Sequence, residues 1–473
     1  MESSVELAAE VRPDPRPRRF WLRTFGCQMN VHDSEKVENL LLHHGYAAAR
    51  DPEDADLLIV NTCSIREKAE HRLYSDLGLL RAWKAALPGR VLGVGGCVAQ
   101  QEGDALLRRF PQVDFVFGTH NLRLVPALAS AAGEGARVAH TEERRSLDRF
   151  ELPSAHPDLA RKNPGRAYLT VMEGCDLFCS FCIVPKTRGR EISRPAAGIL
   201  REAETLARSG VRELVLLGQT VNAYGRQEPR RRTGERADTL PFPGLLHALA
   251  ALPGIARIRY TSPHPLFYDE ALVAAHRDLP ALCPHVHLPL QSGSDGVLRA
   301  MRRRYGRDDY LRLVERLRRV RTDLALTTDL IVGFPGETDR DFEETLSLMR
   351  EAGFVDSFSF KYSPRPGTAA GALEPTRGVP ERVKQTRLEA LQALQRSLTL
   401  DAHRARVGDL TEILLEGPSR RGDQQTGRDP YHRVVNLCAR VPREALPGTL
   451  LPVRIVEATP HSLLAEPTSA RAD

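Results

Sequence analysis

Residues 167–182 read AYLTVMEGCDLFCSFC, and this stretch decides the fold of the central part of the chain. The first half, AYLTVMEG, is a mostly apolar run typical of a buried strand. The second half places Cys175, Cys179 and Cys182 in a C-x3-C-x2-C pattern. In (βα) barrels the catalytic groups collect at the carboxyl ends of the strands. The stretch therefore predicts the first strand of such a barrel, followed by a chemically active loop.

Five more strand candidates follow, with helical patterns such as 198–210 and 307–320 between them. They are ELVLLGQ (213–219), RIRYTSP (257–263), HVHLPLQSG (285–293), ALTTDLIVG (325–333) and SFSFKYSP (357–364). Six units are fewer than the eight of a closed barrel, so we expect an open, partial (βα)6 barrel over residues 161–395. The basic stretch 226–236 is expected to be a solvated insertion.

Toward the amino end, three apolar runs, RFWLRTFG, DLLIVN and RVLGVGG, each precede a turn and a helix-like stretch. This alternation predicts an α/β domain with a doubly wound parallel sheet over residues 19–135. Residues 1–18 are rich in proline and arginine and are expected to be disordered. The charged, proline-dotted stretch 136–160 is expected to be a linker.

Toward the carboxyl end, a long helical pattern near 380–405 is followed by short strand-like runs separated by turn signals. These runs, among them HRVVNLCAR and GTLLPVRIVEAT, predict a small all-β barrel. We expect this third domain to span residues 396–467.

The composition of the chain excludes several classes of protein. The chain has 473 residues, of which 41% are hydrophobic and 27% charged, as in ordinary globular proteins. No apolar run is long enough for a spanning helix, and the first residues do not form a signal peptide, so we expect a cytoplasmic protein without a membrane partner. Eight cysteines are too few for a disulfide scaffold. A net charge of +6 is compatible with a nucleic-acid partner but does not require one.

The C-x3-C-x2-C run offers three thiolates to one centre. Structural zinc is the alternative, but it normally takes four ligands, and no fourth Cys or His lies at the spacing of a zinc finger. Three cysteines instead suit a 4Fe-4S cluster with one iron left open. At that iron a low-potential cluster can reduce S-adenosylmethionine, which then yields a 5′-deoxyadenosyl radical. The run thus indicates a radical enzyme.

Later strand ends supply candidate contacts for S-adenosylmethionine. The alternative is that their glycines only make βα turns. The candidates follow the strands near 217, 290 and 330, and they are Gly218, Gln219, Asn222, Gln291, Ser292, Gly293, Asp329, Gly333 and Gly336.

Three other cysteines share a context. Cys27, Cys63 and Cys97 each end one of the apolar runs of the amino-terminal part, 36 and 34 residues apart. In a parallel sheet they would all emerge at the carboxyl edge, where ligands bind. They could be buried core residues, but their equivalent positions favour a second thiolate-bound cluster with three protein ligands. Cys283 and Cys438 lack such a context and are expected to be packed apolar residues.

With these motifs the sequence resembles the methylthiotransferases, a family of radical-SAM enzymes with a C-terminal TRAM domain. The resemblance covers about residues 19–467, and GCQMN and CSIREKAE are similar to the branch that acts on isopentenyladenosine in tRNA. The runs that carry it are TFGCQMNVHDSE (24–35), NTCSIREKAE (61–70), GGCVAQQEG (95–103), MEGCDLFCSFCIVPKTRGRE (172–191), LPLQSGSD (288–295), IVGFPGETDRDFEET (331–345), SFKYSPRPGT (359–368) and RVVN (433–436).

The resemblance implies the roles of the six cysteines. Cys175, Cys179 and Cys182 would hold the 4Fe-4S cluster that binds S-adenosylmethionine, and Cys27, Cys63 and Cys97 an auxiliary 4Fe-4S cluster that carries or donates sulfur. The implied reaction installs a methylthio group on carbon 2 of the adenine next to the anticodon, at position 37, using one S-adenosylmethionine for the methyl group and another for the radical.

The partners implied by the resemblance are the tRNA anticodon arm carrying isopentenyladenosine, a reductant such as flavodoxin or ferredoxin, and iron–sulfur carrier proteins. We expect a monomer. Two alternatives stay open: the same chemistry on threonylcarbamoyladenosine or on an aspartate of a ribosomal protein, and a non-catalytic iron–sulfur or zinc protein that binds RNA. Candidate phosphate contacts in the last domain are Arg420, Arg421, Arg428 and Arg433.

Overall fold

The computed structural model describes residues 16–64, 67–153, 156, 165–226, 238–419, 422, 424–438 and 446–468. The chain divides into two compact units, residues 1–142 and 143–473. Most of the stretch expected to be disordered, the end of the expected linker and nearly all of the basic insertion lie outside the described residues.

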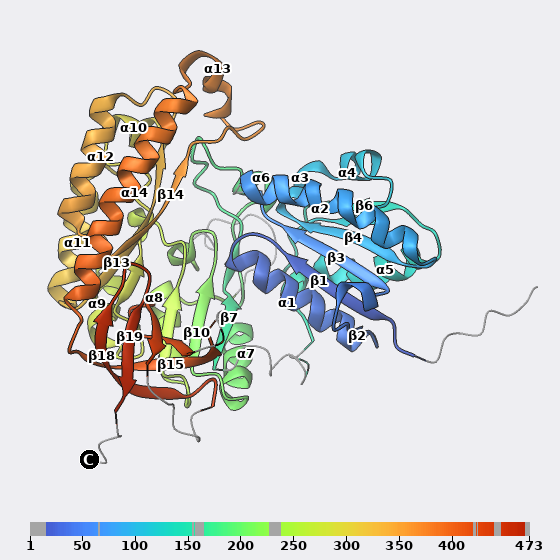
Figure 1. The fold of residues 1–473 in the computed structure, drawn as a ribbon, viewed down its shortest axis with the longest axis horizontal. Coiled ribbons are helices and arrows are strands. Elements are labelled where there is room, and N and C mark those ends of the chain that lie inside the picture. Colours follow the sequence, from blue (N-terminus) through green and yellow to red (C-terminus); the bar gives the residue numbers. More distant parts are fainter. Residues whose placement is uncertain are drawn as a thin grey trace, which may run out of the picture. The chain divides into compact units, whose positions relative to one another are not determined.

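The first unit is built on a parallel sheet of six strands in the order β2-β1-β3-β4-β5-β6 (Figure 1). The strands are β1 (Arg19–Thr24), β2 (Ala47–Ala48), β3 (Leu57–Thr62), β4 (Val91–Gly96), β5 (Phe115–Phe117) and β6 (Val138–His140). Because β2 and β3 flank β1 on opposite sides, the chain reverses direction across the sheet at β1 and β3. Ligands of open α/β sheets bind at the carboxyl end of such a switch point.

Helices cover both faces of this sheet, which confirms the doubly wound α/β domain. They are α1 (Gln28–His43), α2 (Glu67–Ala86), α3 (Cys97–Glu102), α4 (Asp104–Arg109) and α5 (Val125–Gly133). Alternate residues of β3 point to opposite sides: Leu58 and Val60 pack with α2, α3 and α4, whereas Leu57 and Ile59 pack with α1 and α5. Both layers are apolar, so the strands read as continuous hydrophobic runs.

The second unit contains six parallel strands with helices outside them (Figure 1). The strands pair as β7-β10-β11 and β12-β13-β14, and a bridge between Ile258 and Leu282 joins the two sheets. They are β7 (Arg166–Thr170), β10 (Glu213–Leu217), β11 (Arg257–Tyr260), β12 (His285–His287), β13 (Ala325–Val332) and β14 (Asp356–Lys361). No pairing closes β14 onto β7 among the described residues, as expected for an open, partial barrel.

The helices of the second unit pack against one face of these strands and form the largest apolar core of the described chain. They are α7 (Ala196–Arg208), α8 (Phe242–Ala250), α9 (Glu270–Asp278), α10 (Asp295–Ala300), α11 (Arg307–Val320), α12 (Asp339–Ala352) and α14 (Glu381–Arg404), with the short α6 (Val184–Thr187) and α13 (Glu374–Arg377) at the connections. The other face of the strands lines the inside of the partial barrel.

A closed five-stranded barrel follows α14, as predicted. Its strands are β15 (Leu410–Pro418), β16 (Gln425–Arg428), β17 (Val434–Leu437), β18 (Leu450–Ala458) and β19 (Leu463–Pro467). Two expected boundaries differ from the structure. The boundary at 395/396 falls inside α14, because that helix continues to Arg404, and β6 lies within the expected linker because it extends the first sheet.

This small barrel docks on the amino ends of the strands of the partial barrel, at the opposite end from their carboxyl edge (Figure 1). Arg166 at the start of β7 pairs with Glu416 at 2.8 Å, and Asp356 at the start of β14 pairs with Arg433 at 3.0 Å. Arg428 lies 3.1 Å from the same Glu416. This corrects the expectation that Arg428 and Arg433 face RNA phosphates, because both guanidinium groups are already paired in the interface. Arg420 and Arg421 lie outside the described residues.

No helix in the described part of the chain is long and apolar enough to cross a membrane.

Candidate functional site

The cysteine loop of the second unit is closed at its base by a short antiparallel pair, β8 (Met172–Glu173) with β9 (Ile192–Ser193). Gly174 starts the loop at φ +79°, and a Cβ there would overlap the carbonyl oxygen of Arg190. The Gly174 N–H donates to Gln219 Oε1 at 2.5 Å, which ties the loop to the end of β10. Glycine is therefore required where the loop turns back on itself.

The three thiols of this loop are almost enclosed by apolar side chains. Cys175 and Cys179 are buried and pack with Leu177, while Phe181 and Phe267 cover them. Burial raises the pKa of Cys175 and raises that of Cys182 to about 12. Buried thiolates are unfavourable without a positive partner, so this pocket suits a group that brings positive charge to the sulfurs.

Two polar groups reach the sulfurs from outside the loop. The Thr220 hydroxyl lies 3.2 Å from Cys175 Sγ, and Nη1 of Arg303 donates to Cys179 Sγ at 3.5 Å. Hydrogen bonds to cysteinyl sulfurs are a usual feature of iron–sulfur sites, because they spread the negative charge of the ligands. The donor set therefore fits a 4Fe-4S cluster held by three thiolates.

The second set of cysteines meets at the carboxyl edge of the first sheet, at its switch point. Cys63 follows β3, and hydrogen bonds with the thiols of Cys27 and Cys97 are the main cause of its raised pKa, with burial second to them. A Cβ on Gly26, which has φ +135°, would overlap Cys63. The ends of β1, β3 and β4 thus bring these three thiols together, as their equivalent positions predicted.

A polar network fixes this second triad. The buried Asn30 accepts a hydrogen bond from the Cys27 thiol at 3.3 Å and donates to the carbonyl of Thr62 at 3.3 Å. Asn61 in turn donates to the carbonyl of Asn30 at 2.9 Å. Within the described ranges, the buried hydroxyls of Thr62 and Ser64 have no hydrogen-bond partner. Both flank Cys63, so the site fits a group with acceptor atoms such as the sulfides of an iron–sulfur cluster.

Neither triad forms a ready-made site for a single metal ion: among the described residues no three His, Cys, Asp or Glu side chains are arranged to hold one.

Comparison with known proteins also indicates an iron–sulfur enzyme. Residues 169–349 match the Radical SAM superfamily, and residues 19–118 match the Uncharacterized protein family UPF0004. The chain is 48% identical over 447 residues to the tRNA-2-methylthio-N(6)-dimethylallyladenosine synthase of Geobacter metallireducens, covering 94% of this chain and 98% of that protein. The chain belongs to the MiaB-type methylthiotransferases. It is a radical-SAM enzyme, and its family implies S-adenosylmethionine and two 4Fe-4S clusters as cofactors.

Solved structures support the fold alone. The radical S-adenosylmethionine methyltransferase TsrM from Kitasatospora setae, with cobalamin and a 4Fe-4S cluster bound, superposes with a TM-score of 0.55 at 16% identity, over 75% of this chain and 74% of that one. A second structure of TsrM, with tryptophan and an S-adenosylmethionine analogue, gives the same TM-score and identity and covers 75% of each chain.

The cofactor contacts predicted for this methylthiotransferase lie around one edge of the partial barrel. Gly218 and Gln219 follow β10, Gln291 and Ser292 follow β12, and Gly333 follows β13. Gln291 has φ +76°, which is rare for a residue other than glycine, and it bridges to Leu330. Asp329 lies within β13, inside the strand expected at 325–333, and pairs with His287 at 3.4 Å. Its contact with the cofactor stays a prediction.

Several of these residues shape loops in the structure. Asn222 is buried, and its amide both donates to and accepts from the backbone of His264, at 3.0 and 2.8 Å. Gly293 and Gly333 admit neighbouring elements, since a Cβ on either would overlap α12 or Lys384 of α14. For these three residues the turn-making alternative accounts for the geometry, and contact with the cofactor stays a prediction.

The inner face of the methylthiotransferase barrel carries exposed aromatic rings. Leu330 and Val332 of β13 pack toward the helices, so Asp329 and Ile331 face inward. Phe358 and Phe360 of β14 pair with these two residues and share their face. Both rings are open to solvent, at 54% and 37%. Large exposed aromatic side chains inside a barrel indicate a surface kept for a ligand.

Sequence reasoning missed three groups at these sites. Arg303 lies 124 positions from Cys179, and only the run of arginines at 302–304 could have drawn attention to it. Asn30 was quoted in a motif but given no role. The sequence pattern places the aromatic pair on β14 in a strand and indicates nothing further about it.

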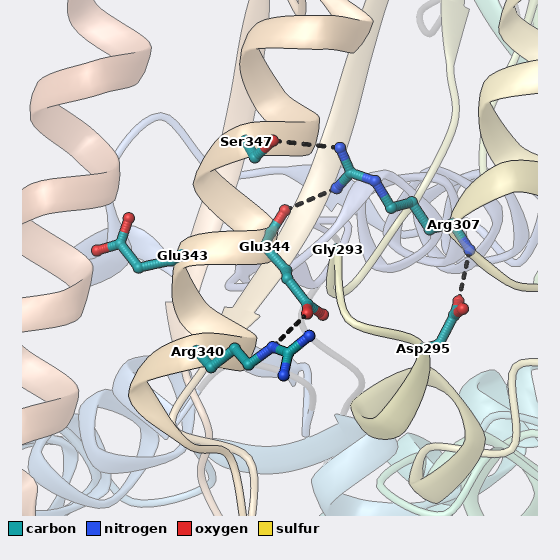
Figure 2. Close-up of a pocket in the computed structure, with 7 residues that line it drawn as sticks. All are labelled: Gly293, Asp295, Arg307, Arg340, Glu343, Glu344 and Ser347. Carbon is teal, nitrogen blue, oxygen red and sulfur yellow. Dashed lines mark hydrogen bonds and ion pairs between the residues drawn. The ribbon is translucent and has the colours of Figure 1, made fainter.

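One surface cavity of about 510 Å³ lies on the helical outside of the partial barrel (Figure 2). Its guanidinium groups are already paired: Arg307 donates to the carbonyl of Glu344 at 2.8 Å, and Arg340 pairs with the carboxylate of Glu344 at 3.2 Å (Figure 2). The Arg307 N–H also donates to Asp295 at 2.7 Å. These contacts join α10, α11 and α12, so we assign the cavity a structural origin.

Proposed function

We propose that this protein adds a methylthio group to carbon 2 of N6-isopentenyladenosine at position 37 of tRNA. The observation that carries the proposal is that one chain holds two separate three-thiol sites, each at the carboxyl edge of a parallel sheet. A radical is needed to activate an unreactive carbon, and a second thiolate-bound group can supply sulfur. The printed activity of the Geobacter relative, at 48% identity, supports this substrate.

The chain's own residues divide the work. Cys175, Cys179 and Cys182 hold the cluster that, when bound, reduces S-adenosylmethionine and so makes the radical. The residues that follow β10, β12 and β13 surround that cofactor. Cys27, Cys63 and Cys97 hold the auxiliary cluster that carries the sulfur.

The inner face of the partial barrel receives the adenine. Phe358 and Phe360 offer aromatic surface to a base and to its apolar isopentenyl group, and base–aromatic stacking contributes about 1–3 kcal/mol per base. A base stacked in the anticodon loop cannot reach this face, so the nucleotide is splayed out of the loop before reaction.

The anticodon arm is the part of tRNA that we assign to the C-terminal barrel. This barrel lies at the amino ends of the strands, and a strand such as β13 (Ala325–Val332) spans about 25 Å. The arm therefore passes along the open side of the partial barrel to bring its loop to the carboxyl edge. Arg420 and Arg421 stay as candidate phosphate contacts in this barrel.

The chemistry requires further partners. A one-electron reductant such as flavodoxin or ferredoxin would supply the electron to the cluster at Cys175, Cys179 and Cys182. Iron–sulfur carrier proteins would load the auxiliary cluster at Cys27, Cys63 and Cys97. Because the substrate is tRNA, we place the protein in the cytoplasm, and we propose that it works as a monomer.

The proposal is tested by mass analysis of tRNA nucleosides from cells lacking this protein. The methylthio derivative of isopentenyladenosine should disappear while isopentenyladenosine accumulates, and the intact gene should restore it. Loss of the methylthio group from threonylcarbamoyladenosine, or from a ribosomal-protein aspartate, would instead assign the chain to a sibling activity. A strain with all three modifications intact would contradict an enzymatic role in this pathway of modification.

A further inference from the structure

Arg303 is a buried cation beside one cluster ligand. Its side chain is 6% exposed, and its Nη1 donates to Cys179 Sγ at 3.5 Å. Its nearest partners are the hydroxyl of Tyr305 and the sulfur of Cys179, which are also the groups that act most strongly on its charge. Burying a guanidinium costs several kcal/mol unless a negative group compensates its charge. The polypeptide alone supplies little negative charge to compensate the buried guanidinium.

The guanidinium is fixed on its other sides. Its Nε donates to Tyr305 Oη at 3.0 Å, and its Nη2 donates to the carbonyl of Pro289 at 3.2 Å. The hydroxyl of Tyr305 donates to the carbonyl of Leu290 at 2.9 Å, which anchors the pair to the segment that follows β12. Three separate contacts thus aim Nη1 at the sulfur.

The backbone around Arg303 is strained, and it is tied to the cysteine loop. Arg302 and Arg304 both adopt left-handed conformations, at φ +61° and +58°. Such residues cost about 1–3 kcal/mol each and persist where the surrounding structure holds them. Ser180, next to Cys179, donates its N–H to the carbonyl of Met301 at 3.1 Å and its hydroxyl to that of Ala300 at 2.8 Å. Two hydrogen bonds therefore connect the segment that carries the arginine to the loop that carries the thiol.

We propose that Arg303 is the fixed counter-charge of the cluster held by Cys175, Cys179 and Cys182, and that it sets the reduction potential of that cluster. Reduction adds one electron, supplied by a one-electron reductant, and so makes the cluster more negative. A positive charge held against a ligand sulfur stabilises the reduced state more than the oxidised state. The inference rests on family membership and on this contact, and it does not depend on the tRNA substrate.

The test is a potential measurement on the reconstituted full-length protein, followed by electron paramagnetic resonance under anaerobic conditions with dithionite as the reductant. In the Arg303→Gln variant the ratio of reduced to oxidised radical-SAM cluster should fall about tenfold at a fixed potential, a midpoint lower by 59 mV for one electron. Arg303→Lys keeps the charge and should stay within about threefold of the wild type.

Two controls separate this role from a structural one. Arg299→Gln removes an exposed arginine from the last turn of the neighbouring helix α10 and should leave the midpoint unchanged. The auxiliary cluster gives an internal reference in every sample, and its midpoint should not move.

A wild-type midpoint in Arg303→Gln with full iron content would overturn the proposal. If that variant binds too little iron to titrate, Arg303→Lys decides. The proposal then requires that Arg303→Lys hold iron at a near wild-type midpoint, and a tenfold shift in this variant, or the loss of its cluster, would overturn it.

Discussion

The two cysteine triads are positioned by opposite means. Cys175, Cys179 and Cys182 lie in one loop, closed by the β8–β9 pair, so that their distances are set mainly by the short chain between them. Cys27, Cys63 and Cys97 come from the ends of three strands, so that their distances depend on the register of a whole sheet. A local site tolerates changes elsewhere in the fold, whereas a site assembled by a sheet exists only when the sheet is intact.

The largest expected effect separates the two triads completely. Replacing Cys175, Cys179 and Cys182 with alanine should abolish cleavage of S-adenosylmethionine, measured as 5′-deoxyadenosine, because no iron is left to bind it. Replacing Cys27, Cys63 and Cys97 should spare this cleavage and stop methylthiolation. In each variant the iron content should fall from about eight to about four atoms per chain.

The controls for this experiment are Cys283→Ala and Cys438→Ala, which remove cysteines outside both triads. They should keep both clusters. Methylthiolated tRNA from the amino-terminal triple variant would show that the auxiliary cluster is assigned to the wrong residues.

The next prediction asks how each triad depends on a single glycine. Gly26→Ala should displace Cys63 and reduce the auxiliary cluster alone, whereas Gly174→Ala should displace the loop at Arg190 and reduce the radical-SAM cluster alone. Each change adds about 1–3 kcal/mol of backbone strain as well as the overlap. The loss would be measured as iron content and as the electron paramagnetic resonance signal of each cluster. We expect more than half of the affected cluster to be lost.

Matched controls exist for this pair, because Gly45 and Gly210 also have positive φ, at +80° and +96°, but no atom lies near their would-be Cβ. Alanine there also introduces the backbone strain of a positive φ, but without the overlap. Equal cluster loss in Gly45→Ala and Gly26→Ala would show that strain, and not the approach to Cys63, governs the site.

The sequence predicted where both sets of cysteines lie, because Cys27, Cys63 and Cys97 each follow an apolar strand-like run and the C-x3-C-x2-C loop follows another. The end of a strand is a local property of the chain. The sequence also predicted the order of α/β units and the final barrel. What it missed depends on contacts between distant segments. Arg303 reaches Cys179 only after β12 and the cysteine loop have come together, and Arg433 proved to bind Asp356 at the start of β14. Neither the composition of the chain nor the spacing of its residues predicts such contacts.

A different kind of effect is expected at the inner face of the partial barrel, which belongs to the unit that carries the loop triad. Phe358→Ala should lower methylthiolation about fivefold to 150-fold, through weaker binding of the extruded base, as expected for the loss of about 1–3 kcal/mol of stacking. Cleavage of S-adenosylmethionine that is not coupled to methylthiolation of tRNA should continue. Phe358→Trp keeps an aromatic surface and should retain most of the activity.

Product formation and 5′-deoxyadenosine would be measured in the same assay on isopentenylated tRNA. A Phe358→Ala variant that loses both in parallel would place this ring at the cofactor rather than at the base.

The smallest effect concerns the unit that carries the loop triad. His276 of α9 is buried, its Nε2 lies 2.6 Å from the hydroxyl of Tyr260, and burial, with a smaller contribution from Arg321, lowers its pKa from 6.5 to about 3. The unfolded chain therefore binds a proton below pH 6.5 that the folded unit refuses, so the free energy of unfolding falls as the pH falls through this window. One such group gives a slope of at most about 1.4 kcal/mol per pH unit.

His276→Gln keeps a polar side chain at this position but cannot titrate. The free energy of unfolding of this variant, measured in urea, should depend on pH less steeply than that of the wild type between pH 6.5 and 5, by about one proton. Above pH 7.5 the two pH dependences should be parallel. Equal slopes for both proteins below pH 6.5 would mean that the folded unit admits the proton at His276 after all.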